Sequence, residues 1–414
     1  MRALLYPSAL KGRVAAPPSK SAAHRALICA ALAGGESRIH GVLPSADMGA
    51  TLRAVAALGA RVSLAGETAL VTGCGGVPRA AGTPVDCGES GSTLRFLLPL
   101  FALSSTPARL TGRGRLPQRP LEPYAAVFQG RGLAFAQDAG GVSFCGPLTP
   151  GVYELPGDVS SQFVSGLLFA LPLLQGPSEI RIRPPFESRP YVDMTLDALA
   201  AFGVTAAFTG GLALAVPGGQ VYRAQGAYRV EGDASQAAFF LTLGAVLGGV
   251  TVTGLNPATR QGDRAMADIL ARCGASPGQK RPLKATRVDL ADCPDLGPIL
   301  MALGLFCQGE TLLYNAGRLR LKESDRAAAM QEELAKLGGR VRLEGDRVYI
   351  QGGPLHEGPP LSSHGDHRVA MALAVAALCA GVPAAIDGAE AVNKSFPGFF
   401  AALQALGARV EYVL

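Results

Sequence analysis

Internal repetition is the feature of this sequence that most restricts its fold. Two kinds of helix-like run alternate along the 414 residues with a period of roughly 70, close to the longest of the common repeat classes. One kind is amphipathic and ends in Leu-Gly-Ala or a looser form of it, at 47–62, 120–135, 190–204, 263–275, 325–341 and 397–410. The other is more apolar, ends in Gly and begins near Ser19, Ser90, Ser160, Asp233, Asp295 and Asp366.

Each repeat is predicted to run strand–helix–strand–helix–strand, with Gly ending the helices. The apolar helices, such as 163–174 (FVSGLLFALPLL), are hydrophobic nearly all round, which indicates burial on every side. We therefore predict an α/β fold with apolar helices inside and sheets outside, an inside-out α/β barrel. Six repeats divide into two domains of three, residues 18–229 and residues 1–17 with 230–414. The alternative is an ordinary doubly wound α/β protein with coincidental Leu-Gly-Ala endings.

Composition limits the functions that such a chain can have. With 48% hydrophobic and 17% charged residues, the chain is neither disordered nor a coiled coil. A net charge of only +6, 6% aromatic residues and no Trp argue against a nucleic-acid-binding surface. The small excess of positive charge instead favours small anionic ligands. The eight cysteines form no C-x-x-C pair, and neither a signal core nor an unbroken membrane-spanning stretch is present. We expect a cytoplasmic monomer with no nucleic-acid or membrane partner.

Unusual polar residues gather where the apolar helices begin. The segments are PPSKS before His24 and Arg25, GESGST before Arg95, DVSSQ at 158–162 and GDHR at 365–368. Helix N-termini attract phosphates and carboxylates through free N–H groups and partial positive charge. Ser and Asp are also ordinary N-caps, and for a single helix that is the better interpretation. Four starts that carry Lys, Arg or Gln within one turn favour anion binding.

Further basic residues lie on the connecting segments. A Gly/Pro-rich loop contains Arg113, Arg115 and Arg119. Lys322 and Arg326 are predicted one turn apart on the same face of an amphipathic helix, and Lys394 precedes another helix start. The alternative for each is a solvated surface.

Metal and nucleotide motifs are weak. His364 and His367 have H-x-x-H spacing, but neither Cys nor a second carboxylate cluster supports them, so we predict no metal. Lys20-Ser21 lacks the glycines of a Walker A loop, which argues against nucleotide hydrolysis of the P-loop kind.

Six segments from about residue 17 to about residue 400 resemble, in order, the 5-enolpyruvylshikimate-3-phosphate synthase family. They are PPSKSAAHRALICAALAGG, CGESGSTLRFL, PGDVSSQFVSGLL, RLKESDR, GDHRVAMA and KSFPGFF. The resemblance implies two domains, each of three βαβαββ units. It implies transfer of the enolpyruvyl group of phosphoenolpyruvate to the 5-hydroxyl of shikimate 3-phosphate, with release of phosphate, by addition and elimination through a tetrahedral intermediate. This reaction serves aromatic amino acid biosynthesis, and no cofactor is expected.

The resemblance also implies roles for individual residues. Shikimate 3-phosphate would be bound by Lys20, Ser21, Arg25, Ser160, Ser161, Gln162, Ser188, Tyr191, Asp295 and Lys322. Phosphoenolpyruvate would be bound by Lys20, Gly91, Arg119, Gln162, Arg326, Arg368 and Lys394. Asp295 would take the 5-hydroxyl proton and Glu323 would protonate the methylene carbon, with Lys20 a second candidate for either transfer. Since these residues come from both halves, ligands are expected to draw the halves together.

The sequence departs from the family's residue pattern at two positions. Glu89 stands where many members have Asn, and Arg318 stands near a position often held by Asn, which puts inhibitor sensitivity in doubt.

Two rival functions are considered. The nearer one is that of the enolpyruvyl transferase that acts on UDP-N-acetylglucosamine, but the mobile loop of that enzyme typically carries a Cys that the loop at 111–123 lacks. The other is a catalytically silent phosphometabolite-binding protein, which would need neither Asp295 nor Glu323.

Overall fold

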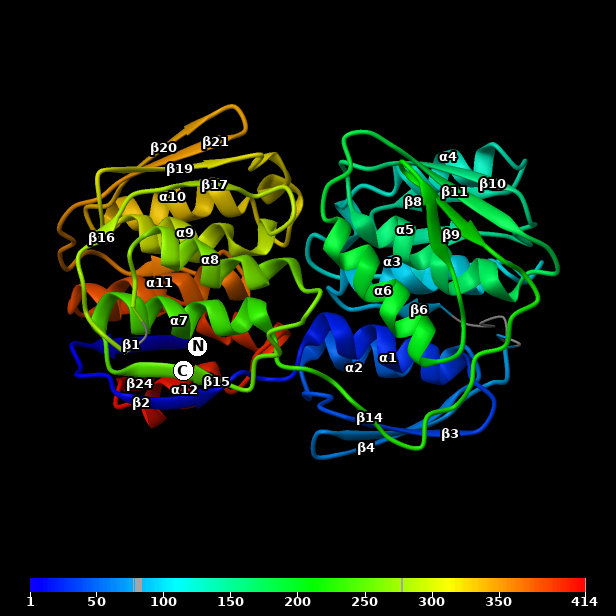
Figure 1. Cartoon of the computed structure of the whole chain (residues 1–414), viewed down its shortest axis with the longest axis horizontal. Helices are drawn as coiled ribbons and strands as arrows, with labels where there is room; N and C mark the ends of the chain where they lie inside the picture. Colours follow the sequence, from blue (N-terminus) through cyan, green and yellow to red (C-terminus); the bar gives the residue numbers. More distant parts are fainter. Residues whose placement is uncertain (77, 79–83, 277, 414) are drawn as a thin grey trace. The chain divides into compact units, whose positions relative to one another are not determined.

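The computed structural model describes residues 1–76, 78, 84–276 and 278–413. The chain divides into two compact units. The N-terminal unit is Lys20–Val230, and the C-terminal unit combines Met1–Ser19 with Glu231–Leu414. Figure 1 colours both along the sequence. Among the described residues, no helix combines the length and apolar character needed to cross a bilayer.

Three four-stranded sheets form the outer surface of the N-terminal unit. In spatial order they are β14-β3-β5-β4 (Tyr228–Arg229, Glu36–His40, Thr68–Thr72, Arg61–Ala65), β6-β7-β9-β8 (Val85–Asp86, Ala108–Thr111, Gly141–Phe144, Phe135–Asp138) and β10-β11-β13-β12 (Val152–Pro156, Ser178–Arg183, Ala213–Val216, Ala207–Gly210). In each sheet the first two strands are parallel and the other pairs are antiparallel. The helices are α1 (Lys20–Leu32), α2 (Ala46–Ala57), α3 (Gly91–Phe101), α4 (Glu122–Gln129), α5 (Ser161–Ala170) and α6 (Arg189–Ala201), with 3-10 turns η1 (Leu116–Gln118) and η2 (Leu171–Leu173).

The C-terminal unit repeats this plan with one difference. Its four-stranded sheets are β17-β19-β21-β20 (Arg287–Asp289, Glu310–Tyr314, Arg347–Gln351, Arg340–Glu344) and β22-β23-β1-β24 (Leu361–Ser362, Ala384–Asp387, Arg2–Tyr6, Arg409–Val413). The fourth repeat has instead, within the described residues, the pairs β15-β2 (Val250–Thr253, Gly12–Ala15) and β16-β18 (Leu283–Lys284, Cys307–Gln308). The helices are α7 (Ala234–Leu247), α8 (Ala265–Arg272), α9 (Gly297–Gly304), α10 (Arg326–Lys336), α11 (His367–Ala380) and α12 (Phe399–Ala405), with 3-10 turns η3 (Gly262–Arg264), η4 (Pro294–Leu296), η5 (Gly317–Leu321) and η6 (Ala389–Lys394).

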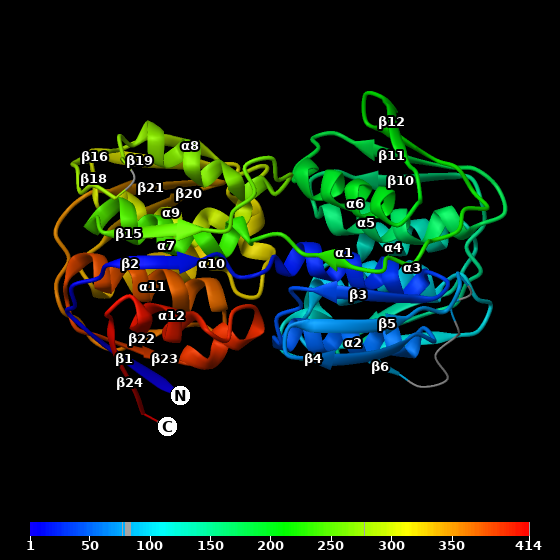
Figure 2. The same ribbon diagram turned by 60° about the horizontal axis from the view of Figure 1, so that its bottom comes forward.

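The first strands of the chain complete sheets whose other strands come from much later in the sequence. Strand β1 lies between β23 and β24 and is antiparallel to both, with Arg2 opposite Asp387 and Val413. Strand β2 is parallel to β15, with Gly12 opposite Val250. Figure 2 shows both arrangements. The C-terminal unit is therefore closed by residues from the N-terminus.

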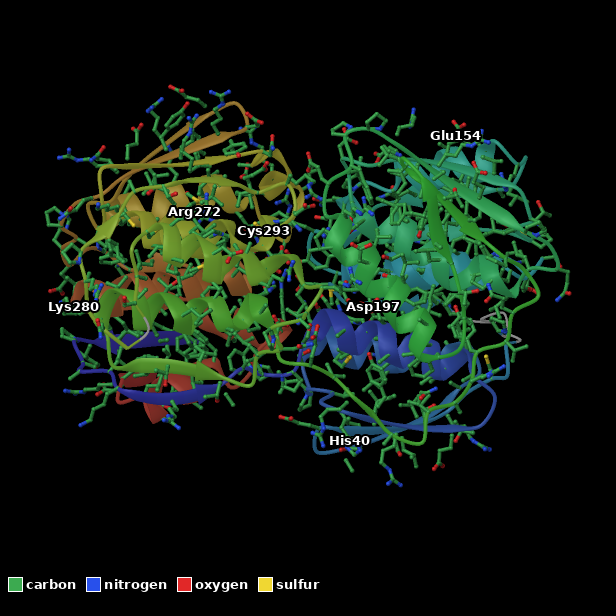
Figure 3. All side chains as sticks on the ribbon, in the orientation of Figure 1. His40, Glu154, Asp197, Arg272, Lys280 and Cys293 are labelled. Atoms are coloured by element: carbon green, nitrogen blue, oxygen red, sulfur yellow. The ribbon has the colours of Figure 1, made fainter. Side chains whose placement is uncertain are left out.

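The interior of each unit is made of helices. Every residue from Ala23 to Leu32 of α1 and from His367 to Leu378 of α11 is buried. Helix α3 packs against α5, and α11 packs against α9 and α7. Exposed charged side chains such as Glu154 on β10 and Lys280 lie at the outer edges of their units (Figure 3). The predicted order, with apolar helices inside and sheets outside, is confirmed.

Two predicted apolar helices are wrong in their extent. The helix expected at 163–174 ends at Ala170, and residues 171–173 form a 3-10 turn that contains Pro172. The helix expected to begin near Asp295 covers only Gly297–Gly304, and Asp295 lies in the preceding turn η4. Proline explains both, because its ring lacks an N–H and clashes with the carbonyl four residues earlier. Pro298 near the start of α9 thus leaves Asp295 outside the helix.

Close packing of α5 leads to a first prediction. A Cβ atom at Gly166 would collide with the Tyr124 hydroxyl and the carbonyl oxygen of Arg95. Both neighbours are buried and bonded to each other at 2.7 Å, so neither can move without breaking that bond. We expect Gly166→Ala to lower the free energy of unfolding by about 1–3 kcal/mol, which is the usual cost of overpacking. Urea denaturation measures this change. Gly226→Ala, at a glycine with open space around it, is the matched control and should unfold like the wild type.

Candidate functional site

Three of the helix starts singled out in the sequence are capped by side chains of their own segments. Ser90 Oγ accepts a hydrogen bond from the backbone N–H of Thr93 at 3.2 Å, and Ser160 Oγ accepts one from Gln162 at 3.3 Å. Asp366 accepts one from the N–H of Arg368 at 2.9 Å. Ordinary capping is therefore confirmed at these positions. The case for a ligand site depends on the cations around them.

Arg25 is a buried cation on α1. Only 3% of the residue is exposed, and its guanidinium donates to Thr195 Oγ1 at 2.8 Å, to the Ser21 carbonyl at 2.7 Å and to the Tyr191 carbonyl at 2.8 Å. All three acceptors are neutral, and within the described residues no carboxylate forms an ion pair with Arg25. Burial lowers the pKa of Arg25 to about 10, so it stays charged at neutral pH. A buried, uncompensated positive charge favours an anionic ligand.

Hydrogen bonds also connect the first turns of α1 to α2 and, through α2, to α3. Lys20 Nζ donates to Asp47 Oδ2 of α2 at 2.6 Å. Behind it, His24 Nδ1 contacts Thr51 Oγ1 at 2.7 Å, and that hydroxyl contacts Thr93 Oγ1 of α3 at 2.6 Å. Burial lowers the pKa of His24 well below its usual range, with Lys20 and Arg25 adding to the shift, so this imidazole is neutral at pH 7. This chain of hydrogen bonds holds α1, α2 and α3 against one another.

Gln162 at the start of α5 links to α3 in the same way. Its Nε2 donates to Ser92 Oγ at 2.9 Å, and its Oε1 accepts from Arg95 Nη1 at 2.9 Å. Gly91 begins α3, and a Cβ there would lie 2.7 Å from Arg119 Nη1. The missing side chain thus lets a guanidinium approach the backbone of a helix start.

The loop arginines and the two departures have separate contacts. Arg113 pairs with Asp86 at 3.2 Å on the surface, and Arg115 is exposed. The carboxylate of Glu89 lies against Gly114 in the same loop. In the C-terminal unit, Arg318 Nη2 donates to the Ala291 carbonyl at 2.5 Å, which joins η5 to the loop after β17.

Ser188 occupies the N-cap position of α6 and has an unusual backbone conformation. It has φ 56° and ψ 34°, the left-handed region that residues other than glycine seldom adopt. The residue is buried and precedes Tyr191, whose carbonyl accepts from Arg25. Strained residues of this kind cluster at ligand sites. The N-terminal unit thus gathers Lys20, Ser21, Arg25, Gly91, Arg119, Ser160, Ser161, Gln162, Ser188 and Tyr191 at or beside four helix starts and one loop.

In the C-terminal unit the centre is the carboxylate of Asp295. Lys322 Nζ lies 3.1 Å from Oδ1, Arg326 Nη1 lies 2.9 Å from Oδ1, and Arg368 Nη2 lies 3.1 Å from Oδ2. Burial alone would raise the pKa of Asp295, but Arg368, Lys322 and Arg326 outweigh it and hold the pKa well below its usual range. Burial lowers the pKa of Lys322, which Asp295 partly offsets.

Arg326 connects Asp295 to two other acidic residues. It donates to Glu323 Oε2 at 2.7 Å and to Asp366 Oδ2 at 2.8 Å, and its side chain is only 2% exposed. Burial would lower the pKa of Arg326, but Asp366, Glu323 and Asp295 raise it. Arg326 is therefore permanently charged.

Arg368 and Lys394 complete this group. Arg368 Nη1 donates to Ser235 Oγ of α7 at 2.6 Å, and Lys394 Nζ donates to the Gly365 carbonyl at 2.7 Å. The C-terminal unit thus brings together Asp295, Lys322, Glu323, Arg326 and Arg368, with Lys394 next to the start of α11.

One predicted position in this group is wrong. Lys322 does not share a helix with Arg326, because Asp325 caps α10, which begins at Arg326. Lys322 instead ends the turn η5. Lys394 ends the turn η6 and precedes α12, which begins at Phe399. Lys322 and Arg326 still converge, since both reach Asp295.

One group of potential metal ligands is present among the described residues, Glu332, Glu333 and His364. Glu333 already accepts hydrogen bonds from Lys336 Nζ at 2.8 Å, His364 Nε2 at 2.8 Å and the Ser362 N–H at 2.8 Å. The ammonium of Lys336 occupies the place beside this carboxylate that a cation would take. The donor set is therefore that of a structural ion pair.

Sequence reasoning missed several partners of the site residues. Asp47 binds Lys20, Ser235 binds Arg368, and Asp366 binds Arg326. Each lies within two residues of a helix start, so their positions were a usable signal. The sequence did not indicate which residues would contact each other, because those contacts depend on how the helices pack.

Comparison with known proteins gives a consistent result. The sequence profile of the family described as EPSP synthase (3-phosphoshikimate 1-carboxyvinyltransferase) matches residues 5–403. A 3-phosphoshikimate 1-carboxyvinyltransferase of Clostridium kluyveri is 41% identical over 417 residues, which cover 98% of this chain and 97% of that one. One from Clostridium botulinum strain Eklund 17B is 39% identical over 419 residues, covering 97% and 96%.

Solved structures agree with the sequence relatives. An EPSP synthase from Acinetobacter baumannii superimposes with a TM-score of 0.82 at 25% identity over the full length of both chains. The enolpyruvyl transferase NikO from Streptomyces tendae has a TM-score of 0.80 at 19% identity, covering 100% of this chain and 98% of its own, which shows a shared fold.

Proposed function

Since the chain belongs to the EPSP synthase family, we propose that its two groups of helix-start residues are the two halves of one active site. The protein is an enolpyruvyl transferase of the shikimate pathway, and its substrates are small molecules. Phosphoenolpyruvate donates the enolpyruvyl group to the 5-hydroxyl of shikimate 3-phosphate, and phosphate is released. The proposal concerns which residues carry out this reaction.

Charge matching supports the assignment of ligands. The substrates carry two phosphates and two carboxylates, and basic side chains with planar, multiple donors suit these groups best. In the N-terminal unit the uncompensated guanidinium of Arg25 supports a phosphate or carboxylate beside Ser21 and Tyr191. We assign shikimate 3-phosphate to this region with Lys20, Ser160, Ser161, Gln162, Ser188 and, from the other unit, Asp295 and Lys322. We assign phosphoenolpyruvate to Lys20, Gly91, Arg119, Gln162, Arg326, Arg368 and Lys394.

The observation that carries the mechanism is the contact of one carboxylate, Asp295, with three cations. In this state the low pKa of Asp295 makes it a weak base. Substrate phosphates and carboxylates would compete for Lys322, Arg326 and Arg368, which would weaken their hold on Asp295 and raise its pKa. Substrate binding would thereby prepare Asp295 to take the 5-hydroxyl proton during addition.

Glu323 is the proposed acid. Its carboxylate is largely buried, and Arg326 holds it at 2.7 Å within the same group. In the addition step, Glu323 would give its proton to the methylene carbon of phosphoenolpyruvate while the 5-hydroxyl oxygen, deprotonated by Asp295, bonds to the adjacent carbon. In the elimination step, the resulting methyl group would lose a proton as the bond from the adjacent carbon to the phosphate oxygen breaks, which restores the double bond and releases phosphate. The surrounding Lys and Arg side chains would stabilise charge on the departing phosphate. Lys20 stays a second candidate for either proton transfer.

Phosphate release tests the proposal against its rivals. Purified protein should release inorganic phosphate when mixed with phosphoenolpyruvate and shikimate 3-phosphate, but not when UDP-N-acetylglucosamine replaces the latter. Phosphate release from phosphoenolpyruvate with the nucleotide sugar, but not with shikimate 3-phosphate, would identify the related transferase. Binding of both substrates with no release would identify a silent binding protein.

Arg25 provides a prediction for substrate affinity. Arg25→Met keeps most of the buried volume but removes the charge, so we expect KM for shikimate 3-phosphate to rise at least about tenfold, as for loss of one charge-assisted contact. Steady-state kinetics measures this. Arg61→Met, at an exposed arginine on β4 of the same unit, is the control. Equal KM values in both variants would argue against Arg25 as a ligand.

Closure is a further prediction of this proposal. We propose that residues 18–229 and residues 1–17 with 230–414 act as two domains of a cytoplasmic monomer, which anionic substrates draw together by relieving repulsion between cations. The radius of gyration in small-angle X-ray scattering should fall when shikimate 3-phosphate is added. An unchanged radius at saturating substrate contradicts closure.

A further inference from the structure

A hollow of about 430 Å³ lies on the outer face of the sheet β17-β19-β21-β20, and none of the residues assigned above lines it. Its lining residues are Arg287, Leu312, Tyr314, Asn315, Asp346 and Arg347. All lie in the C-terminal unit and come from β17, β19, β21 and the segments next to them. The volume falls in the range of small-molecule sites.

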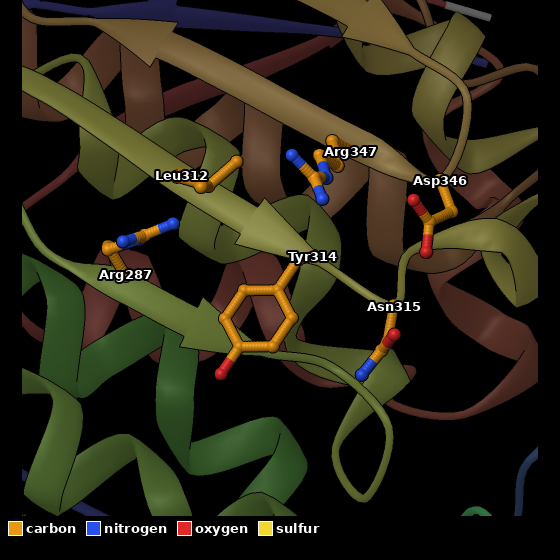
Figure 4. Close-up of a pocket in the computed structure, with 6 residues that line it drawn as sticks. All are labelled: Arg287, Leu312, Tyr314, Asn315, Asp346 and Arg347. Atoms are coloured by element: carbon orange, nitrogen blue, oxygen red, sulfur yellow. The ribbon is translucent and has the colours of Figure 1, made fainter. Parts of the chain in front are cut away.

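The two arginines face each other across one strand. Arg287 on β17 is paired in register with Leu312 of β19, and Arg347 begins β21 on the other side of β19. Figure 4 shows both guanidiniums extending toward Leu312, with the ring of Tyr314 beside them. Leu312 is only 9% exposed although it belongs to the outer face. The hollow therefore has an apolar floor and a cation on each side.

The charges at the hollow are unbalanced. Two guanidiniums and one carboxylate, Asp346, line it. Within the described residues, the guanidinium of Arg287 has neither a hydrogen-bond nor an ion-pair partner. Guanidinium pairs bind oxyanions through several N–H groups, and a tyrosine ring offers a flat apolar face for stacking. We propose that this hollow binds a small ligand in which an oxyanion is attached to a planar ring, with the oxyanion between Arg287 and Arg347 and the ring on Tyr314.

The strands that hold this pocket lead directly to the proposed active site. After β17 the chain continues to Asp295, and after β19 it continues through η5 to Lys322. The two segments are joined by the N–H of Leu290 to the Tyr314 carbonyl at 3.0 Å and by Asn315 Nδ2 to Asp289 Oδ1 at 2.8 Å. If the proposed function holds, occupancy of the pocket will change KM by shifting these segments.

Methyl NMR of the full chain tests binding without relying on activity. Leu312 lies on the floor, so its ¹³C-methyl signals, assigned with Leu312→Ile, report on this pocket rather than on the active site. Phenyl phosphate should move them saturably. Arg287→Gln and Arg347→Gln should each weaken that binding about tenfold, the loss of one charged contact.

Matched controls make the result decisive. Arg409→Gln removes an exposed arginine that lies 4.4 Å from the Tyr6 ring on another sheet of the same unit, and it should bind phenyl phosphate like the wild type. Inorganic phosphate, which lacks the ring, should bind more weakly. Leu312 signals that do not move in the wild type, or that show wild-type affinity for phenyl phosphate in Arg287→Gln and Arg347→Gln, overturn the proposal. Equal affinity for inorganic phosphate overturns the role of Tyr314.

Discussion

Replacing Asp295 by asparagine is expected to lower turnover by at least about 100-fold, the usual size of the loss of a general base. Asparagine keeps the shape of the side chain but cannot accept a proton at neutral pH. The KM values should not rise, because the substitution removes a negative charge from a group that binds anions. Steady-state and single-turnover phosphate release measure both quantities.

The control for this variant is Asp268→Asn, at an exposed aspartate on α8. It should retain normal turnover. Circular dichroism of both variants tests whether the fold survives the removal of one carboxylate from three cations. Near-normal turnover of a folded Asp295→Asn protein would refute the assignment and direct attention to Glu323 and Lys20.

Arg326→Met is expected to reduce the free energy of unfolding of the C-terminal unit by about 3–5 kcal/mol, the usual cost of breaking a buried ion pair. The reason is Asp366, which is fully buried and would lose the cation that donates to it. Urea denaturation measures the loss of unfolding free energy, and hydrogen exchange of the amides in α10 and α11 shows whether the loss arises in these helices. Arg340→Met, on the exposed side of β20, should change stability little.

The effect of Arg326→Met should depend on pH. In the wild type, burial would raise the pKa of Asp366, but Arg326 outweighs it and lowers the pKa. This contribution to stability is present above the usual aspartate pKa of about 4 and is lost as the pH falls. In the variant, burial without the cation raises the pKa, so protonation on acidification restores stability.

The difference in stability between the two proteins should therefore narrow as the pH falls from 7 toward 4. Adding Asp366→Asn to Arg326→Met should recover part of the loss at pH 7. A loss below about 1 kcal/mol at pH 7, within the range of exposed pairs, would show that Arg326 and Asp366 are not energetically coupled.

The sequence predicted the interior of this fold well, because the signal is strong and local. The apolar helices begin within one residue of Ser19, Ser90, Ser160, Asp233 and Asp366, as expected from their periodicity and caps. Where a proline intervened, at Pro172 and Pro298, the predicted helix was too long. Periodicity alone does not detect such a break.

The candidate site was predictable by residue type but not by pairing. Helix-start motifs identified Arg25 and Arg326, yet nothing local indicated that Arg25 would bond only to neutral groups or that Arg326 would contact three carboxylates. Such contacts join residues up to 170 positions apart and depend on which helices pack together. The roles assigned to these residues stay predictions until the variants are measured.

The place of β1 between β23 and β24 has a consequence for synthesis on the ribosome. The strand made first pairs with the two strands made last, and the bond from Arg2 to Asp387 spans 385 positions. At ordinary translation speeds of about 5–20 residues per second, β1 waits on the order of 20–80 s for its neighbours. The unit Lys20–Val230 contains all its own strands, so it can fold during that interval while β1 remains unpaired.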